Sequence, residues 1–318
     1  MNALQEIKPE AIAIADTLEA VIGDYIASMD AKPTTASTYQ KALKQFQKWI
    51  AANGVTTISR ADLLEYKRFL TANYSAATVS SYIGAVKGLY KWLEAERISP
   101  NIAAGIKGAK NPKGFRKDTL TPHQAKRILN SIDRETLEGL RNYALFNLLL
   151  RTGLRTIEAH RANINDIRQE AGQALLYIQG KGRDSKDDFI ILTAATLEPI
   201  QNYITARGER TGEAPLFISH GNRSKGNRLT VRSISRIVKE AMREAGIDSD
   251  RLTAHSLRHS AITFSLLGGA TIQEAQSLAR HTSILTTTIY AHNINRIASA
   301  PEAKIDRFLD AAEDMSEK

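Results

Sequence analysis

Residues 173–192 read QALLYIQGKGRDSKDDFIIL, in a chain whose other segments show mostly helical periodicity. Two apolar runs, 173–178 and 188–192, flank a segment that contains Gly180-Lys181-Gly182. This arrangement predicts two strands with the glycine segment in the turn between them. We therefore expect a mainly α protein with a small antiparallel sheet.

Helices are predicted on both sides of these strands. Before them, Pro122 is placed to open a helix, and residues 140–150 are apolar enough to form a buried one. After them, periodic segments predict helices at about 196–207, 230–245, 257–267, 272–279 and 284–293. Residues 118–300 are therefore expected to form one domain, helical around the sheet.

The chain before residue 105 has a helical pattern throughout. Within residues 38–50 one face is apolar, and the opposite face carries Lys41, Lys44 and Lys48. A second apolar stripe runs through residues 79–93 and is flanked by Lys87 and Lys91. A third helix should begin after Ser59, a typical N-cap residue. Residues 12–104 are therefore predicted to form a bundle of four or five helices.

Small residues occupy the far face of the predicted helix 79–93, where Gly84 and Gly88 lie four positions apart. A helix that is small on one face and basic at its margins can approach a sugar-phosphate backbone closely. A solvated lysine face explains either basic helix equally well.

A basic segment, residues 105–117, separates the two halves of the chain. It holds three glycines, one proline and five basic residues without an acid, so we expect an extended linker. Its cations are predicted to contact phosphate, with a solvated surface loop as the alternative. They are Lys107, Lys110, Lys113, Arg116 and Lys117.

The composition narrows the classes of protein. Among 318 residues, 43 Lys+Arg against 34 Asp+Glu give a formal net charge of +9, which suits a nucleic-acid-binding protein and an ordinary enzyme alike. The chain has no cysteine, which excludes disulfides, thiolate metal sites and a cysteine nucleophile. Charged residues interrupt the N-terminus and no apolar run could span a membrane, so a cytoplasmic, nucleoid-associated protein is expected.

Two separated motifs could carry chemistry. In Thr152-Gly153-Leu154-Arg155-Thr156-Ile157-Glu158, a glycine turn places Arg155 at the start of a helix, near backbone amides that favour an anion. Glu158 lies three residues on and could hold Arg155 in place, or form a plain surface ion pair with it. Arg258 lies in His255-Ser256-Leu257-Arg258-His259, and the two guanidinium groups could clamp one phosphodiester.

The order of these elements resembles that of the tyrosine recombinase (phage integrase) family. The elements are Thr-Gly-Leu-Arg-x-x-Glu, the lysine in Gly-Lys-Gly, His-x-Leu-Arg-His, His281, and Tyr290 nine residues later. The resemblance covers nearly the whole chain. It implies an N-terminal helical core-binding (SAM-like) domain, followed by an α+β catalytic domain.

The resemblance also implies roles for residues. Tyr290 would be the nucleophile that attacks a scissile DNA phosphate and becomes joined to its 3′ end. Arg155 and Arg258 would neutralise the phosphate in the transition state. His255 would handle the proton of the nucleophile, which fits a phenol that needs a base.

Further roles follow from the same resemblance. His281 would hydrogen-bond the phosphate, and Lys181 would protonate the departing 5′-oxygen. Glu158 and His259 are expected to support these groups. This chemistry requires no metal ion and no other cofactor, and the chain has no phosphate-binding loop for a nucleotide.

Assembly is also implied by the family. The expected partner is a double-stranded DNA recombination site, bound by a homodimer, with two sites paired in a homotetramer that passes through a Holliday junction. Residues 301–318 form the predicted C-terminal tail, with an amphipathic pattern between Pro301 and Met315. In the family such a tail docks on the next protomer, although packing on its own domain is the alternative.

The chain departs from the family pattern at one position. The family usually has Leu-Gly-His before the second histidine, whereas this chain has Leu278-Ala279-Arg280-His281. Arg280 could contact DNA or a neighbouring protomer, or point to solvent. The N-terminus is also too short for the arm-binding domain of larger integrases, so a simple two-domain recombinase is expected.

The motifs are also compatible with two other functions. A type IB topoisomerase-like nickase would share the phosphotyrosine chemistry but act without strand exchange. A catalytically inactive DNA-binding regulator could keep the fold without needing Tyr290 together with both arginines. Within the recombinases, integration or excision of a mobile element and Xer-type resolution are both compatible with the motifs.

Overall fold

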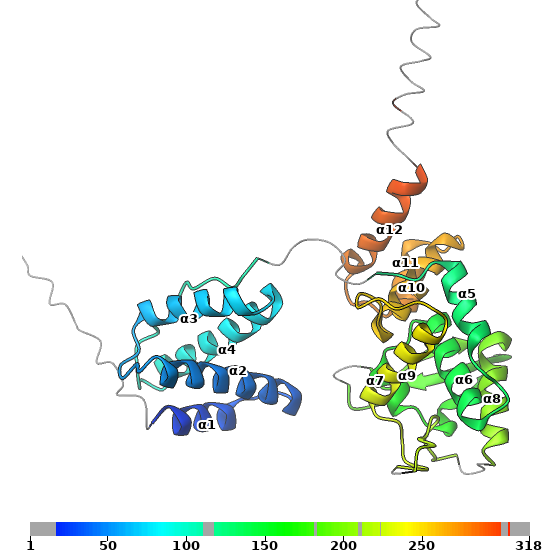
Figure 1. Ribbon diagram of the computed structural model, residues 1–318, viewed down its shortest axis with the longest axis horizontal. Helices are drawn as coiled ribbons and strands as arrows, with labels where there is room; N and C mark the ends of the chain where they lie inside the picture. The colour runs from blue at the N-terminus through cyan, green and yellow to red at the C-terminus, as the bar shows by residue number, and fades with distance from the viewer. Residues whose placement is uncertain are drawn as a thin grey trace, which may run out of the picture. The chain divides into compact units, whose positions relative to one another are not determined.

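A computed structural model describes residues 17–110, 118–180, 183–208, 212–222, 224–299 and 305 of the protein (Figure 1). The chain divides into two compact units, Met1–Lys113 and Gly114–Lys318. Each unit buries its own hydrophobic core.

The described part of the first unit is a helical bundle. Its helices are α1 (Leu18–Ser28), α2 (Pro33–Ala52), α3 (Arg60–Asn73) and α4 (Ala76–Ala95). Helix α2 packs against both α1 and α4, and α3 packs against α4. The predicted apolar stripes are confirmed as core, since Leu43, Phe46 and Leu89 are fully buried. The predicted start of α3 is also confirmed, because Ser59 and Asp62 form a capping box.

Gly88 lies at a helix contact, whereas the sequence pattern placed it on a face that could approach DNA. A Cβ at this position would overlap the Tyr25 hydroxyl and come within 3.2 Å of the Tyr39 ring. The glycine therefore lets α1 and α2 pack closely on α4, and it does not present a bare backbone for DNA. Gly84, by contrast, faces open space.

The beginning of the predicted linker belongs to the first unit. Ile106 is 4% exposed and lies in that unit's core. The Ser80 hydroxyl donates a hydrogen bond to the carbonyl of Ala109 at 2.9 Å. Residues 105–110 are therefore docked on the bundle and are not an extended linker, because apolar side chains alternate with the lysines. The remainder, 111–117, lies outside the described residues.

The second unit is mostly helical. Its helices are α5 (Pro122–Ser131), α6 (Leu137–Thr152), α7 (Thr156–Arg161), α8 (Ala194–Ala206), α9 (Val231–Glu244), α10 (Ala254–Leu267), α11 (Ile272–Ala279) and α12 (Ile284–Ser299). Helix α6 is buried along most of its length and packs against α5, α7, α8, α9 and α10 (Figure 1). The predicted buried helix is therefore the central element of this unit. The predicted C-terminal tail, residues 301–318, lies outside the described residues apart from Ile305.

The sheet is antiparallel, with the order β1-β2-β3. Strands β2 (Gln173–Ile178) and β3 (Asp188–Leu192) agree with the prediction and pair with Leu176 opposite Ile190. Strand β1 (Ile167–Glu170) was not predicted. Three of its four residues are exposed and polar, so it lacks the apolar alternation by which a strand is recognised.

None of the helices in the described ranges combines the length and the apolar character needed to cross a bilayer.

Candidate active site

Arg155 is fixed at the junction between α6 and α7. Helix α6 ends at Gly153, which has φ of 61° and so adopts the left-handed conformation that glycine favours. Two residues later, Arg155 is the N-cap of α7. Its side chain is 28% exposed, so the guanidinium can reach a ligand while the backbone of Arg155 is held in the helix cap.

Glu158 holds Arg155 through two hydrogen bonds. One carboxylate oxygen accepts from the Arg155 backbone N–H at 2.8 Å, and the other accepts from the guanidinium Nη1 at 2.8 Å. The Glu158 side chain is 0% exposed. The predicted pairing of Arg155 with Glu158 is therefore present, and it is buried on the glutamate side instead of being a surface ion pair.

Arg258 enters the same region from α10. Its Nη1 donates to the carbonyl of Gly153 at 2.6 Å, and its Nη2 donates to the carbonyl of Ala279. The side chain is 3% exposed. Burial, followed by the positive charges of Arg155 and Arg280, lowers the Arg258 pKa to about 10, so the group stays protonated at neutral pH. Each terminal nitrogen carries a second hydrogen beyond the one given to these carbonyls.

Tyr290 lies on α12 and contacts a histidine of α10. Its hydroxyl is hydrogen-bonded to Nδ1 of His259. The rings of His259 and His255 meet edge to face with centroids 4.6 Å apart, because the two residues are four positions apart on one helix. The sequence assigned the proton of Tyr290 to His255, whereas the described hydrogen bond of the hydroxyl runs to His259.

The titration of these groups follows from burial. Tyr290 is 5% exposed, and burial raises its pKa to about 12, partly offset by Arg258. Burial, with the neighbouring His255 as the next cause, lowers the pKa of His259 to about 4. At neutral pH the phenol therefore keeps its proton and the imidazole is neutral, so the hydroxyl can donate to Nδ1.

His281 and Arg280 follow the end of α11. His281 Nδ1 is hydrogen-bonded to the hydroxyl of buried Thr287 at 3.0 Å, and its ring stacks at 6.3 Å from that of Tyr290. Burial lowers the pKa of His281 to about 4, with Arg258 as the next cause. Burial and the charges of Arg258 and Arg155 also lower the pKa of His255, although this residue is exposed to solvent on part of its surface.

Of the predicted catalytic residues, five are gathered in this cluster: Arg155, His255, Arg258, His281 and Tyr290. The supporting residues Glu158 and His259 also lie in it. Lys181 falls in the hairpin between β2 and β3 and lies outside the described residues. Sequence reasoning missed Thr287, for which the only signal is its place one helical turn before Tyr290.

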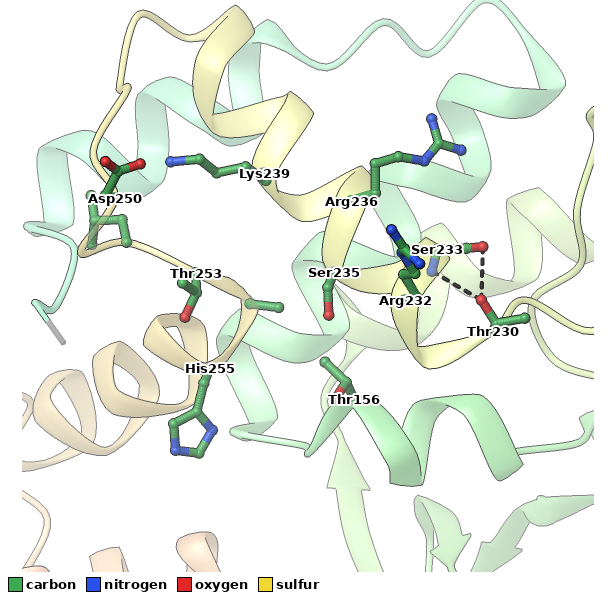
Figure 2. A pocket seen from close by; sticks show the side chains of 12 residues that line it. Thr156, Thr230, Arg232, Ser233, Ser235, Arg236, Lys239, Asp250, Thr253 and His255 are labelled. Carbon is green, nitrogen blue, oxygen red and sulfur yellow. Dashed lines mark hydrogen bonds between the residues drawn. The ribbon is translucent and has the colours of Figure 1, made fainter. Parts of the chain in front are cut away.

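A cavity of about 810 Å³ opens beside His255. It lies between α9 and the first turns of α7 and α10, and Figure 2 shows His255 and Thr156 at one end of it, with Lys239 extending toward Asp250 at the other. Hydroxyl groups and cations line it, namely Thr156, Thr230, Arg232, Ser233, Ser235, Arg236, Lys239 and Thr253. Such a lining suits phosphate oxygens, since hydroxyls donate and cations neutralise charge.

The predicted DNA-binding lysines of the first unit lie on its surface. Lys41, Lys44, Lys48, Lys87, Lys91, Lys107 and Lys110 are all exposed. Lys113, Arg116 and Lys117 lie outside the described residues.

Known proteins resemble both units. Residues 118–296 match the family described as "Phage integrase family", and residues 24–97 match "Phage integrase, N-terminal SAM-like domain". "Tyrosine recombinase XerC" of Pelobacter propionicus is 32% identical over 270 residues, covering 82% of this chain and 85% of the relative. "Tyrosine recombinase XerD" of Listeria monocytogenes serotype 4b is 27% identical over 288 residues, covering 87% and 94%.

Solved structures agree at the level of the fold. The crystal structure of XerH site-specific recombinase bound to palindromic difH substrate, a post-cleavage complex, superposes with a TM-score of 0.70. It is 24% identical in sequence and covers 91% of this chain and 85% of that one.

Proposed function

Since the chain belongs to the phage integrase family of tyrosine recombinases, which are enzymes that cut and rejoin DNA, we propose that it is a site-specific recombinase with Tyr290 as its nucleophile. The observation that supports this most is the contact of the Tyr290 hydroxyl with His259, beside Arg258, whose own charge interacts with those of Arg155 and Arg280. A nucleophile, a proton acceptor and fixed cations are the groups that attack on a phosphodiester requires.

The first step would be attack by the Tyr290 oxygen on phosphorus. The phenolic proton passes to an imidazole, a Tyr290–phosphorus bond forms and the bond from phosphorus to the 5′-oxygen breaks. Arg155 and Arg258 hold the non-bridging oxygens while charge grows on them. His281 donates a further hydrogen bond to the same oxygens.

A second proton transfer would be to the leaving group. The 5′-oxygen departs as an alcohol if Lys181 protonates it, and the product is a 3′-phosphotyrosine. The covalent bond conserves the energy of the phosphodiester, so a 5′-hydroxyl of another strand can reverse the step. Exchange of strands between two sites would then pass through a Holliday junction.

The DNA would be held by both units. Exposed lysines of the first unit, residues 107–117 and the cavity beside His255 would contact phosphates of the duplex. A dimer on each site and a tetramer of two sites are expected, with the C-terminal tail exchanged between protomers. The relatives named XerC and XerD favour an Xer-type resolution role, and integration or excision of a mobile element is the other assignment within the same chemistry.

Covalent trapping on nicked DNA tests the nucleophile. Duplexes drawn from the DNA that flanks the gene, each with a nick near the candidate site, should yield a protein–DNA adduct that survives denaturation. The Tyr290→Phe variant should bind the same duplexes equally well and form no adduct. An adduct in that variant would exclude Tyr290 as the nucleophile, and the lack of one in the wild-type protein on every duplex would favour a DNA-binding regulator.

Strand exchange separates the recombinase from a topoisomerase-like nickase. Two labelled sites mixed with the protein should give recombinant joints. Relaxation of supercoiled DNA without such joints would favour the nickase.

A modified leaving group tests Lys181. A 5′-bridging sulfur departs without a proton, so it should restore cleavage by Lys181→Ala. Equal impairment on the sulfur and oxygen substrates would contradict the role of general acid.

A further inference from the structure

Arg280 adopts a backbone conformation that an arginine rarely takes. It ends α11 with φ of 51° and ψ of 48°, in the left-handed region that favours glycine. The His281 N–H donates to the carbonyl of Gln276 at 3.2 Å, which completes the helix end. Glycine would satisfy the same turn without a steric cost, so any advantage of arginine at this position lies in the contacts of its side chain.

The side chain folds inward onto the active site. It is 9% exposed, so it neither points to solvent nor extends over the surface. Its Nη2 donates to Glu158 Oε2 at 2.8 Å, while Glu158 Oε1 accepts from Arg155. One buried carboxylate therefore holds two guanidinium groups, and Arg280 limits the movement of the residue that holds Arg155.

A second contact leads toward the hairpin of Lys181. The Nε atom of Arg280 lies 4.0 Å from Oδ2 of Asp188, and it makes no hydrogen bond within the described residues. Asp188 is the first residue of β3, the strand that leaves the hairpin. The guanidinium thus lies between the α7 turn and the base of that hairpin.

The residues on either side of Arg280 also belong to the site. The carbonyl of Ala279 accepts from Arg258, and the next residue is His281. We propose that Arg280 is a positioning residue that ties the Arg155–Glu158 turn, the start of β3 at Asp188 and the segment bearing His281 into one arrangement. This inference rests on the proposed function.

The test is single-turnover cleavage of the nicked duplex at saturating protein, for wild type, Arg280→Gly and Arg280→Lys. We expect Arg280→Gly to cleave about 10- to 100-fold more slowly, since small displacements of catalytic groups have effects of this size. Its affinity for DNA should stay within about twofold of wild type. Its melting temperature should change little, because relief of the positive φ offsets part of the stability lost with the buried contact to Glu158. Arg280→Lys should cleave at an intermediate rate, because one ammonium can meet Glu158 but cannot also reach Asp188.

The matched control is Arg97→Gly. Arg97 is an exposed arginine of the first unit with φ of 59°, so the same substitution relieves the same backbone conformation away from this cluster. It should leave cleavage unchanged. Wild-type cleavage by Arg280→Gly would overturn the inference, and so would weaker DNA binding with an unchanged cleavage rate, which would make Arg280 a direct DNA contact.

A double-mutant cycle tests the contact between Arg280 and Asp188. Asp188→Asn should slow cleavage in the wild-type background and have little further effect beside Arg280→Gly. Equal effects in both backgrounds would contradict the tie to the hairpin. An adduct formed by the wild type in the same experiment separates this inference from the proposed function, because only loss of that adduct would overturn the latter.

Discussion

A buried phenol that is hydrogen-bonded to a neutral imidazole is a poor nucleophile until a base takes its proton. In this protein the Tyr290 pKa is raised to about 12, and His259 accepts its hydrogen bond. His255 packs against the ring of His259, and its pKa is lowered by burial first and then by the charges of Arg258 and Arg155. At the scale of single residues, the two histidines would then have different tasks: His259 would orient the hydroxyl, and His255, which interacts with both Arg258 and Arg155, would lie with the charges that meet the phosphate.

This division predicts the behaviour of His259→Gln. The variant should lose about 100-fold in the single-turnover rate of cleavage, the size typical of a misplaced reacting group, with unchanged affinity for DNA. His123→Gln alters an exposed histidine of α5 and is the control. A normal rate in His259→Gln would leave the proton of Tyr290 to His255 alone.

The same histidines predict how stability depends on pH. In the unfolded chain a histidine binds a proton below about pH 6.5, whereas His259 and His281 in the folded protein do so only near pH 4. Between these values the unfolded state binds more protons, so stability should fall as the pH falls from about 6.5 toward 4. Melting temperatures at several pH values should show this fall, and it should be smaller in His259→Gln. Parallel curves for the two proteins would contradict the assignment.

At the scale of elements, the end of α6 organises the cluster around Tyr290. Gly153 has φ of 61°, its carbonyl accepts from Arg258, and Arg155 caps the next helix. A Cβ on Gly153 would lie 3.4 Å from the Cβ of Ala261. The turn at Gly153 therefore fixes the positions of Arg155 and Arg258 relative to each other.

Gly153→Ala should consequently affect stability and activity together. The positive φ should cost about 1 kcal/mol of unfolding free energy, and displacement of the Gly153 carbonyl should slow cleavage. Gly172→Ala is the matched control, because Gly172 has φ of 77° with open space around it, in the turn between β1 and β2. Denaturant unfolding should show a similar loss for both variants, with slower cleavage only in Gly153→Ala.

Elements with a strong period were predictable from the sequence, and the exceptions share a cause. The spacing of apolar residues predicts helices such as α11 and the strands β2 and β3. Strand β1 forms because it pairs with β2, and the local sequence pattern of β1 does not predict this pairing. The same holds for Gly88, whose neighbours come from α1 and α2, and for Arg280, whose partner Glu158 is 122 positions away in sequence.

At the scale of the whole molecule, the positive charges fall into two sets. The lysines of α2 and α4 are exposed on the first unit, whereas Arg155 and Arg258 of the second unit are fixed by hydrogen bonds in the cluster around Tyr290. The first set would position the duplex, and the second would act on one phosphate. The assignment of motifs to this cluster came from the sequence, but the mutual support of its members required the folded chain.

This distribution predicts the dependence of DNA binding on salt. Lys44→Gln should weaken binding to unrelated duplexes by a similar factor, and it should lower the slope of log Kd against log salt by about one. Lys126→Gln, on the exposed side of α5, is the control. Fluorescence anisotropy over a range of KCl concentrations measures both, and an unchanged slope for Lys44→Gln would remove that lysine from the DNA surface.

The burial of Tyr290 bears on fidelity. A phosphotyrosine is an ester that water could hydrolyse, and hydrolysis would leave a permanent break in the DNA. With its side chain 5% exposed, Tyr290 is sheltered among α10, α11 and α12. If the ester forms where the hydroxyl now lies, bulk water is a poor competitor for it. A DNA end delivered by the bound duplex would then be the preferred acceptor, so the enzyme could pause between cutting and joining without losing the strand.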